Sequence, residues 1–337
     1  MSRWLYSSLV NTTGVLALIV VVYFVTYTPW LMNSVSFLLS DSFIQLNTIF
    51  LSILIEAVPF VLIGVLTAGF IQMYITEEHI RRWIPKNKYK AIIMSCLVGA
   101  VFPACECGIV PIVRRLVKKG VPLYAGVGIL LTGPLINPMV ILSTYMAFGN
   151  HVTMAGLRVG GGFTAALLIT LSISTLFKSN QLKGPLADPV HKEAQAGTNR
   201  SFSYKARGMM QHSIDEFFDM GKYLIIGAFI AASFQTYIPV KSLYLFGDGL
   251  MYSTSVMMGL AYFLSLCSEA DAFIGASFSN LFPSVSILAF LIYGPMIDLK
   301  NTIMLLSVFK IKFVTVLLLL ITAIVFGSII VTQSLFL

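Results

Sequence analysis

Long apolar segments dominate this sequence, and they limit the folds that it can adopt. Runs of about the length that a helix needs to cross a bilayer recur along the whole chain. They cover residues 14–32, 44–75, 120–148, 153–177, 220–239, 284–299 and 313–332. Backbone polar groups inside a bilayer must be satisfied internally, and such runs do this as helices. We therefore predict an all-α polytopic membrane protein with about seven spanning helices.

The low content of charged residues supports this class. Hydrophobic residues make up 57% of the chain and charged residues 11%, whereas soluble proteins carry about 25% charged residues. A net charge of +8 could indicate a nucleic-acid partner. The Lys and Arg residues lie in short segments between apolar runs, however, where they set membrane orientation. We expect the lipid bilayer as a partner and no nucleic acid.

The apolar runs also suggest where the chain divides. The first run, about Gly14 to Met32, is too long for the core of a signal peptide, and no small-x-small cleavage site follows it. We therefore predict a retained N-terminal transmembrane helix within residues 1–40. Residues 178–212 contain Gly, Pro, Asn, Gln and mixed charges, which favours a cytoplasmic linker. It would separate a first permease repeat, 41–177, from a second, 213–337.

The two halves resemble each other at an offset of 161 to 163 positions. The matching pairs are Glu56 with Asp219, Gly64 with Gly227, Glu106 with Glu269, Gly133-Pro134 with Gly294-Pro295, and Asn137 with Asp298. Internal repeats with interrupted apolar segments at matching places indicate the binding site of a transporter.

Two further apolar runs, 91–113 and 254–280, are broken by polar residues and helix breakers. If each enters the membrane and returns on the same side, 20 of the 22 Lys and Arg residues become cytoplasmic, and only Arg158 and Lys241 lie outside. The positive-inside rule favours this topology. Each half then has three crossings and one re-entrant hairpin, so the halves are inverted repeats. The hairpin tips would approach each other at mid-membrane.

The first tip contains Cys105, Glu106 and Cys107. An ionisable group at the bilayer centre costs about 2.5–3.5 kcal/mol and usually serves a function. Thiolates suit soft ions such as Cu(I), Zn(II) or trivalent arsenic. We predict that all three residues bind substrate and that the two cysteines are candidate metal ligands. The alternative is a structural tip with a neutral Glu106 bonded to the hairpin backbone.

The second tip offers one thiol, one hydroxyl and two carboxyls, from Cys267, Ser268, Glu269 and Asp271. We predict that these residues also bind substrate, the alternative being a pair of acids at an aqueous vestibule. We interpret Cys96 as a small buried hydrophobic residue.

Helix breakers lie in both halves, and freed backbone carbonyls at such breaks can coordinate a substrate. The predicted breakers are Pro103, Gly108, Pro111, Gly133, Pro134, Gly294 and Pro295. The alternative for the two Gly-Pro pairs is a packing kink. Asn137 and Asp298 each follow a Gly by four residues, so we predict that they face the same cavity and bind substrate. Glu56 and Asp219, in or at the start of apolar helices, are candidates for proton carriage or a structural role.

Three motifs carry a family resemblance. They run from Phe102 to Gly120, from Leu130 to Pro138 and from Cys267 to Ile274, and they resemble predicted permeases of the ArsP/YraQ type. The resemblance covers nearly the whole chain beyond the first helix. It implies a multi-pass protein of the bacterial cell membrane. Some members export trivalent organoarsenicals, which implies thiol coordination by Cys105 and Cys107. Some relatives work beside a second membrane subunit, which is therefore a candidate partner.

Three functions compete. The first is export of a soft metal, metalloid or organometalloid, such as a trivalent arsenical. The second is a permease subunit for an unrelated solute, with the Cys-Glu-Cys tip structural. The third is a membrane redox protein, which would usually need a Cys-x-x-Cys pair or membrane histidines; the sequence has neither. We find no nucleotide-binding motif, so we expect a transporter without a cofactor rather than an enzyme, driven by the proton gradient.

Overall fold

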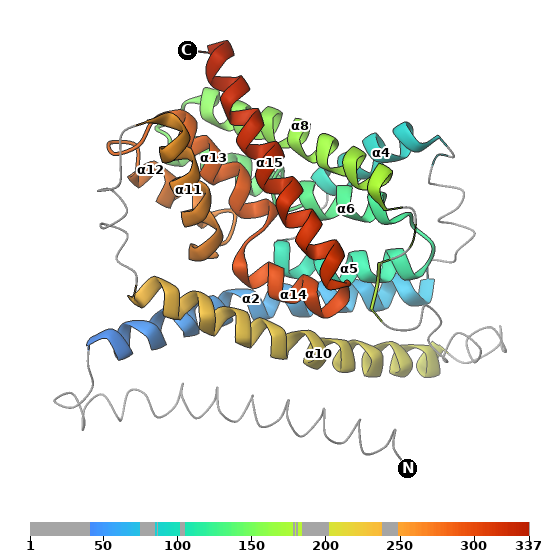
Figure 1. The fold of residues 1–337 in the computed structure, drawn as a ribbon. Coiled ribbons are helices and arrows are strands. Elements are labelled where there is room, and N and C mark those ends of the chain that lie inside the picture. Colours follow the sequence, from blue (N-terminus) through green and yellow to red (C-terminus); the bar gives the residue numbers. More distant parts are fainter. Residues whose placement is uncertain are drawn as a thin grey trace.

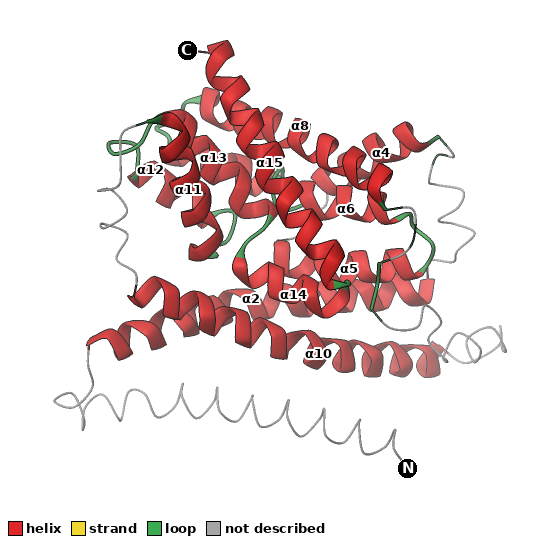
Figure 2. Ribbon diagram, in the orientation of Figure 1, coloured by secondary structure: helices red, strands yellow, loops and turns green. Residues whose placement is uncertain are grey.

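The computed structural model describes residues 41–74, 85, 87–101, 105–177, 179, 181–183, 202–237 and 249–336. Over these residues the regular structure is helical, apart from one isolated β-bridge between Leu182 and Phe309 (Figure 2). The predicted all-α class is therefore confirmed. The predicted N-terminal helix within residues 1–40 lies outside the described residues.

The two halves contain helices in the same order. In the first half these are α2 (Asp41–Tyr74), α4 (Lys88–Val101), α5 (Glu106–Lys118), α6 (Leu123–Thr132), α7 (Pro138–Ala147) and α8 (Val152–Leu176). In the second half they are α10 (Phe202–Tyr237), α11 (Leu250–Leu264), α12 (Ala270–Ser277), α13 (Ser284–Met296), α14 (Leu299–Val308) and α15 (Ile311–Phe336). Over the described residues, each half thus begins and ends with a long helix and has four short ones between.

Five of the described helical stretches are long and apolar enough to cross a membrane. They are Ser42–Ile71, Val152–Leu176, Ser213–Tyr237, Ser284–Val308 and Ile311–Ser334. The predicted run 120–148 forms two short helices instead, α6 and α7. Gly133 and Pro134 follow the end of α6, and Asn137 caps the start of α7. The Gly-Pro break predicted here is present.

Part of the packing between helices is matched in the two halves, although α2 packs on α5 while α10 packs on α14. Helices α2 and α10 lie side by side and cross beneath the rest of the bundle in the view of Figure 1. Helix α4 packs on α6 as α11 packs on α13, and α6 packs on α8 as α13 packs on α15. Across the halves, α5 contacts α14 while α12 contacts α7. Two repeats would give this pattern, and their inverted orientation stays a prediction.

Two of the predicted helix breakers in the first half are wrong. Gly108 and Pro111 lie inside α5, which begins at Glu106 with Cys105 as its N-cap. Pro111 removes one hydrogen-bond donor but does not end the helix. Gly108 allows close packing, since a Cβ atom there would lie 2.8 Å from the Phe60 carbonyl oxygen of α2, and one at Gly64 would overlap the Gly108 carbonyl. Pro103 lies outside the described residues.

The second Gly-Pro pair also lies inside a helix, contrary to the prediction. Gly294 and Pro295 form part of the last turn of α13, and the backbone becomes extended only at Ile297 and Asp298. A proline so close to a helix end removes one hydrogen bond and leaves the rest of the turn intact. Gly294 instead makes room for a carboxyl group, because a Cβ atom there would lie 2.7 Å from Asp271 Oδ2.

The segment joining the halves differs from the predicted linker at its end. Helix α10 already begins at Phe202, before the predicted boundary at 213. Nearer its start, the Lys183 amide donates to the Val308 carbonyl and the Lys310 amide to the Gln181 carbonyl. These bonds attach the segment to the turn between α14 and α15.

Candidate functional site

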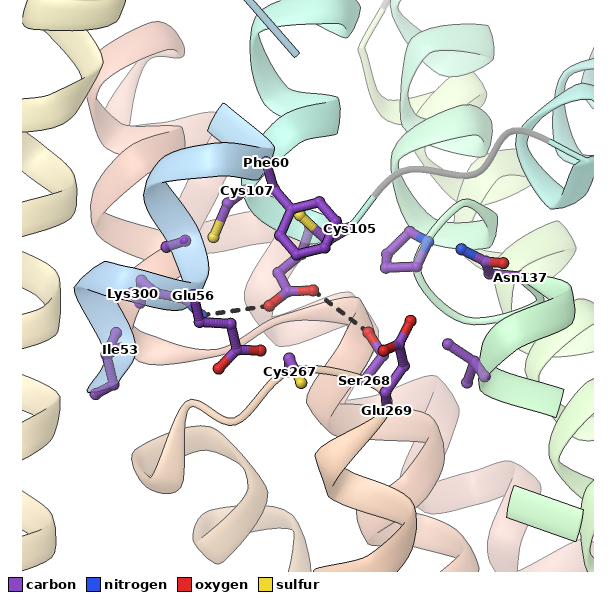
Figure 3. Close-up of a pocket in the computed structure, with 14 residues that line it drawn as sticks. Ile53, Glu56, Phe60, Cys105, Cys107, Asn137, Cys267, Ser268, Glu269 and Lys300 are labelled. Atoms are coloured by element: carbon purple, nitrogen blue, oxygen red, sulfur yellow. Dashed lines mark hydrogen bonds and ion pairs between the residues drawn. The ribbon is translucent and has the colours of Figure 1, made fainter. Parts of the chain in front are cut away.

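The two predicted hairpin tips meet inside the bundle. The first is the start of α5, with Cys105 to Cys107, and the second is the turn from Cys267 to Glu269 that precedes α12. The Ser268 hydroxyl donates a hydrogen bond to Glu106 Oε2 at 3.3 Å (Figure 3). Side chains about 160 positions apart in the sequence therefore form one site.

A cavity of about 60 Å³ lies between the tips. Nine residues predicted for the site line it: Glu56, Cys105, Glu106, Cys107, Pro134, Asn137, Cys267, Ser268 and Glu269. A water molecule needs roughly 10–15 Å³ measured in this way, so the cavity has room for a few waters or a small solute. Apolar side chains of α2, including Ile53 and Phe60, complete part of its wall.

Thiols from both halves line this cavity. Those of Cys105 and Cys107 lie within hydrogen-bonding reach of each other. The Cys267 thiol faces Glu56 and accepts the Ala270 amide at 3.4 Å. Cys96 lies elsewhere, fully buried beside Thr170 of α8. Among the described residues no three His, Cys, Asp or Glu side chains are arranged to hold a metal ion.

Lys300 is a site residue that the sequence did not indicate. The positive-inside topology assigns it to the cytoplasmic side, but the structure buries it at the cavity with 4% of its surface exposed. Its Nζ lies 3.3 Å from Glu106 Oε1 and 3.7 Å from Asp298 Oδ2. This basic group therefore neutralises buried carboxylates instead of marking topology. In the sequence, only the nearby Asp298 could have indicated that Lys300 pairs with a buried acid. Its other partner, Glu106, lies 194 positions away.

Arg158 is a second buried cation that the sequence did not indicate. The positive-inside topology assigns it to the outer side, but it lies in α8 with 1% exposure. Its Nη1 donates to Thr144 Oγ1 at 2.7 Å and its Nη2 to the Ser268 carbonyl at 3.1 Å. Its charge also interacts with that of Asp271. Arg158 therefore fixes the backbone of the second tip, whose hydroxyl contacts Glu106.

Three acids predicted for the site do not line the cavity. Asp271 is buried beside Arg158 and Gly294. Asp298 is the N-cap of α14 and accepts the Asn301 amide at 2.5 Å. Asp219 is half-exposed on α10 and forms an ion pair with Lys222 at 2.6 Å. Of the repeat-related acids Glu56 and Asp219, only Glu56 faces the cavity.

Four helix N-termini surround this cavity. Cys105, Asn137 and Glu269 are the N-caps of α5, α7 and α12, and Lys300 lies in the first turn of α14. The N-terminus of a helix carries about half a positive charge. The carboxyl groups of Glu56, Glu106 and Glu269 line the same cavity. Broken helices that direct their N-termini at a central site are typical of secondary transporters.

Comparisons with known proteins find a matching family model and related proteins. A family model described as "Predicted permease", ArsP_1, matches residues 42–333. The UPF0718 protein YcgR of Bacillus subtilis is 52% identical over 292 residues, covering 86% of this chain and 98% of that protein. A Streptococcus mutans protein named as a two-component membrane permease complex subunit is 42% identical over 276 residues, covering 82% and 91%. No solved structure matches the chain.

Proposed function

Because this chain belongs to the ArsP_1 family of predicted permeases, we propose that it exports a small thiol-binding solute through the cavity between the hairpin tips. It is a multi-pass protein of the bacterial cell membrane. The class of solute that we propose is a soft metal, metalloid or organometalloid, such as a trivalent arsenical. The relatives' names state no substrate, so this class rests on the side chains of the cavity.

One observation carries the proposal: Cys105 and Cys107 of the first half and Cys267 of the second line one small cavity. Thiolates prefer soft ions and metalloids over Na⁺ or Mg²⁺. Thiols contributed by both halves also suit alternating access, in which one half moves against the other around a fixed site. Lys300 compensates Glu106, while Glu56 and Glu269 also line the cavity, so the site can hold a cationic soft ion as well as a neutral metalloid.

A second candidate is a permease subunit for an unrelated solute, with a structural Cys-Glu-Cys tip. Two observations favour it. Both oxygens of Glu106 are engaged, one by Lys300 and the other by Ser268. The described residues also lack a three-ligand metal cluster. Under this candidate the thiols would only pack the start of α5 against α2.

We further propose that the chain works with a second membrane subunit and is a transporter without enzymatic activity. The name of the Streptococcus mutans relative describes a subunit of a two-component complex, which supports the first point. For the second point, the cavity groups are arranged around helix N-termini in the manner of a transport site. The proton gradient is the proposed energy source.

The test is uptake of arsenite, Cu(I) or Zn(II) into inverted membrane vesicles that contain the protein. We expect at least one probe to accumulate with the wild type, and Cys105→Ser and Cys107→Ser each to abolish this uptake. Cys96→Ser is the matched control, because this buried thiol lies outside the cavity. Normal uptake by the double variant Cys105→Ser/Cys107→Ser would favour the second candidate.

A further inference from the structure

Asp298 carries a charge that its structural role does not require. It caps α14, with Oδ1 accepting the Asn301 amide. In the first half the same place is occupied by Asn137, whose side chain caps α7 by accepting the Met139 amide at 3.1 Å. A neutral amide therefore suffices for the cap, and Asn is as good an N-cap as Asp. The negative charge at 298 needs another explanation.

The other oxygen of Asp298 is buried, and its partner Lys300 is too distant for a hydrogen bond of normal length. Asp298 is 1% exposed, and its Oδ2 accepts no hydrogen bond from the part of the chain that the structure describes. Lys300 Nζ lies 3.7 Å away and is closer to Glu106. Buried carboxylates are costly unless they are paired and hydrogen-bonded. This oxygen is therefore open to a further cation.

A count of the charged groups around Asp298 also indicates room for a further cation. Asp298 faces Lys300 on its own helix, Glu106 on α5, Asp271 on α12 and the Tyr262 hydroxyl on α11. Arg158 on α8 lies beside Asp271. Within the described residues, three buried carboxyl groups thus share two cations. The cluster can accept one more positive charge, and the partial charges of the helix N-termini offset only part of the excess.

We propose that Asp298 binds one exchangeable monovalent cation, a proton or Na⁺, and that this cation couples transport to an ion gradient. Asp298 forms an ion pair with Lys300 but does not itself line the thiol cavity. The ion site and the substrate site are therefore separate. The inference rests on the proposed function for its role in transport. Cation binding itself is independent of the substrate.

Lys300 connects the two sites. In the structure the Lys300 ammonium lies 3.3 Å from Glu106 and 3.7 Å from Asp298, and in this proposal it stays on Glu106 while the cation occupies Asp298. When the cation leaves, Lys300 moves to Asp298 Oδ2 and releases Glu106 Oε1 to the cavity for a cationic or hydrogen-bond-donating substrate. Substrate and coupling cation would thus be bound alternately, which is the requirement for antiport.

The experiment compares the purified wild type with Asp298→Asn, without any substrate. Infrared difference spectra on exchange from H₂O to D₂O report protonated carboxyl groups, and thermal unfolding in NaCl or in choline chloride at equal ionic strength reports Na⁺. We expect either a carboxylic acid band that Asp298→Asn removes, or a rise in melting temperature with Na⁺ that the same variant abolishes. The first result identifies a proton and the second Na⁺.

Asp219→Asn is the control, because it removes an acid at the surface of α10, and it should retain the wild-type response in both assays. Asp298→Ser provides a second neutral N-cap in case Asp298→Asn fails to fold. The proposal is overturned if the neutral variants at 298 give the infrared band and the Na⁺ response of the wild type. Normal soft-ion uptake by Cys105→Ser/Cys107→Ser would leave this result unchanged, so the two proposals fail separately.

Discussion

Replacing Lys300 by Met tests whether the buried charges hold the two halves together. Lys300 is 4% exposed, and its two carboxylate partners are 3% exposed (Glu106) and 1% exposed (Asp298). Removing one member of a buried pair leaves an uncompensated charge and costs about 3–5 kcal/mol. We therefore expect Lys300→Met to lower the free energy of unfolding by about this amount. Glu106→Gln/Lys300→Met should recover part of the loss, with a coupling energy of about 2–3 kcal/mol in the double-mutant cycle.

The assay is unfolding of the purified protein in mild detergent for the wild type, the two single variants and the double variant. Lys222→Met is the control, since Lys222 pairs with Asp219 at a half-exposed site, where an ion pair contributes about 0–1 kcal/mol. The reasoning fails if Lys300→Met is no more destabilising than Lys222→Met. It also fails if the effects of Lys300→Met and Glu106→Gln simply add.

Three further predictions concern helix packing, tip positioning and topology. Gly64→Ala should destabilise the contact of α2 with α5 by about 1–3 kcal/mol in the same unfolding assay. At Gly160 a Cβ atom meets no neighbouring atom, so Gly160→Ala should be neutral or stabilising. Equal effects of the two substitutions would contradict the packing account. Arg158→Met should cost about 1.5–3 kcal/mol for each charge-assisted hydrogen bond lost to Thr144 and the Ser268 carbonyl, with partial rescue by Arg158→Lys, and wild-type stability of Arg158→Met would refute this role. In a thiol-free background, single cysteines at 88 and 118 should react with an impermeant maleimide only from the cytoplasm and one at 151 only from outside; 88 and 118 on opposite faces would exclude the inverted repeat.

The meeting of the two tips could be predicted from the sequence for a physical reason. Acids inside apolar runs are costly, so Glu106 and Glu269 stand out, and their common offset with the surrounding motifs places them at equivalent positions of two repeats. The structure brings both to one cavity. The internal similarity thus carried long-range information that composition alone does not contain.

Lys300 and Arg158 could not be placed in this way. The positive-inside rule treats each basic residue by its local context, whereas their burial depends on partners such as Glu106 and Ser268 that lie far away in the sequence. Helix propensity likewise gave a wrong prediction, of helix breaks, at Gly108 and Pro295. Both residues weaken an isolated helix, yet both lie in helices here, because contacts of the surrounding bundle outweigh the local cost.

X-ray absorption spectroscopy of the purified protein loaded with arsenite or Cu(I) tests the central claim most directly, because it identifies the atoms bound to the probe. Our account predicts sulfur neighbours for at least one probe, retained in Cys96→Ser and lost in Cys105→Ser/Cys107→Ser. Binding through oxygen or nitrogen alone with both probes, or sulfur neighbours that persist in the double variant, would contradict a thiol site between the hairpin tips.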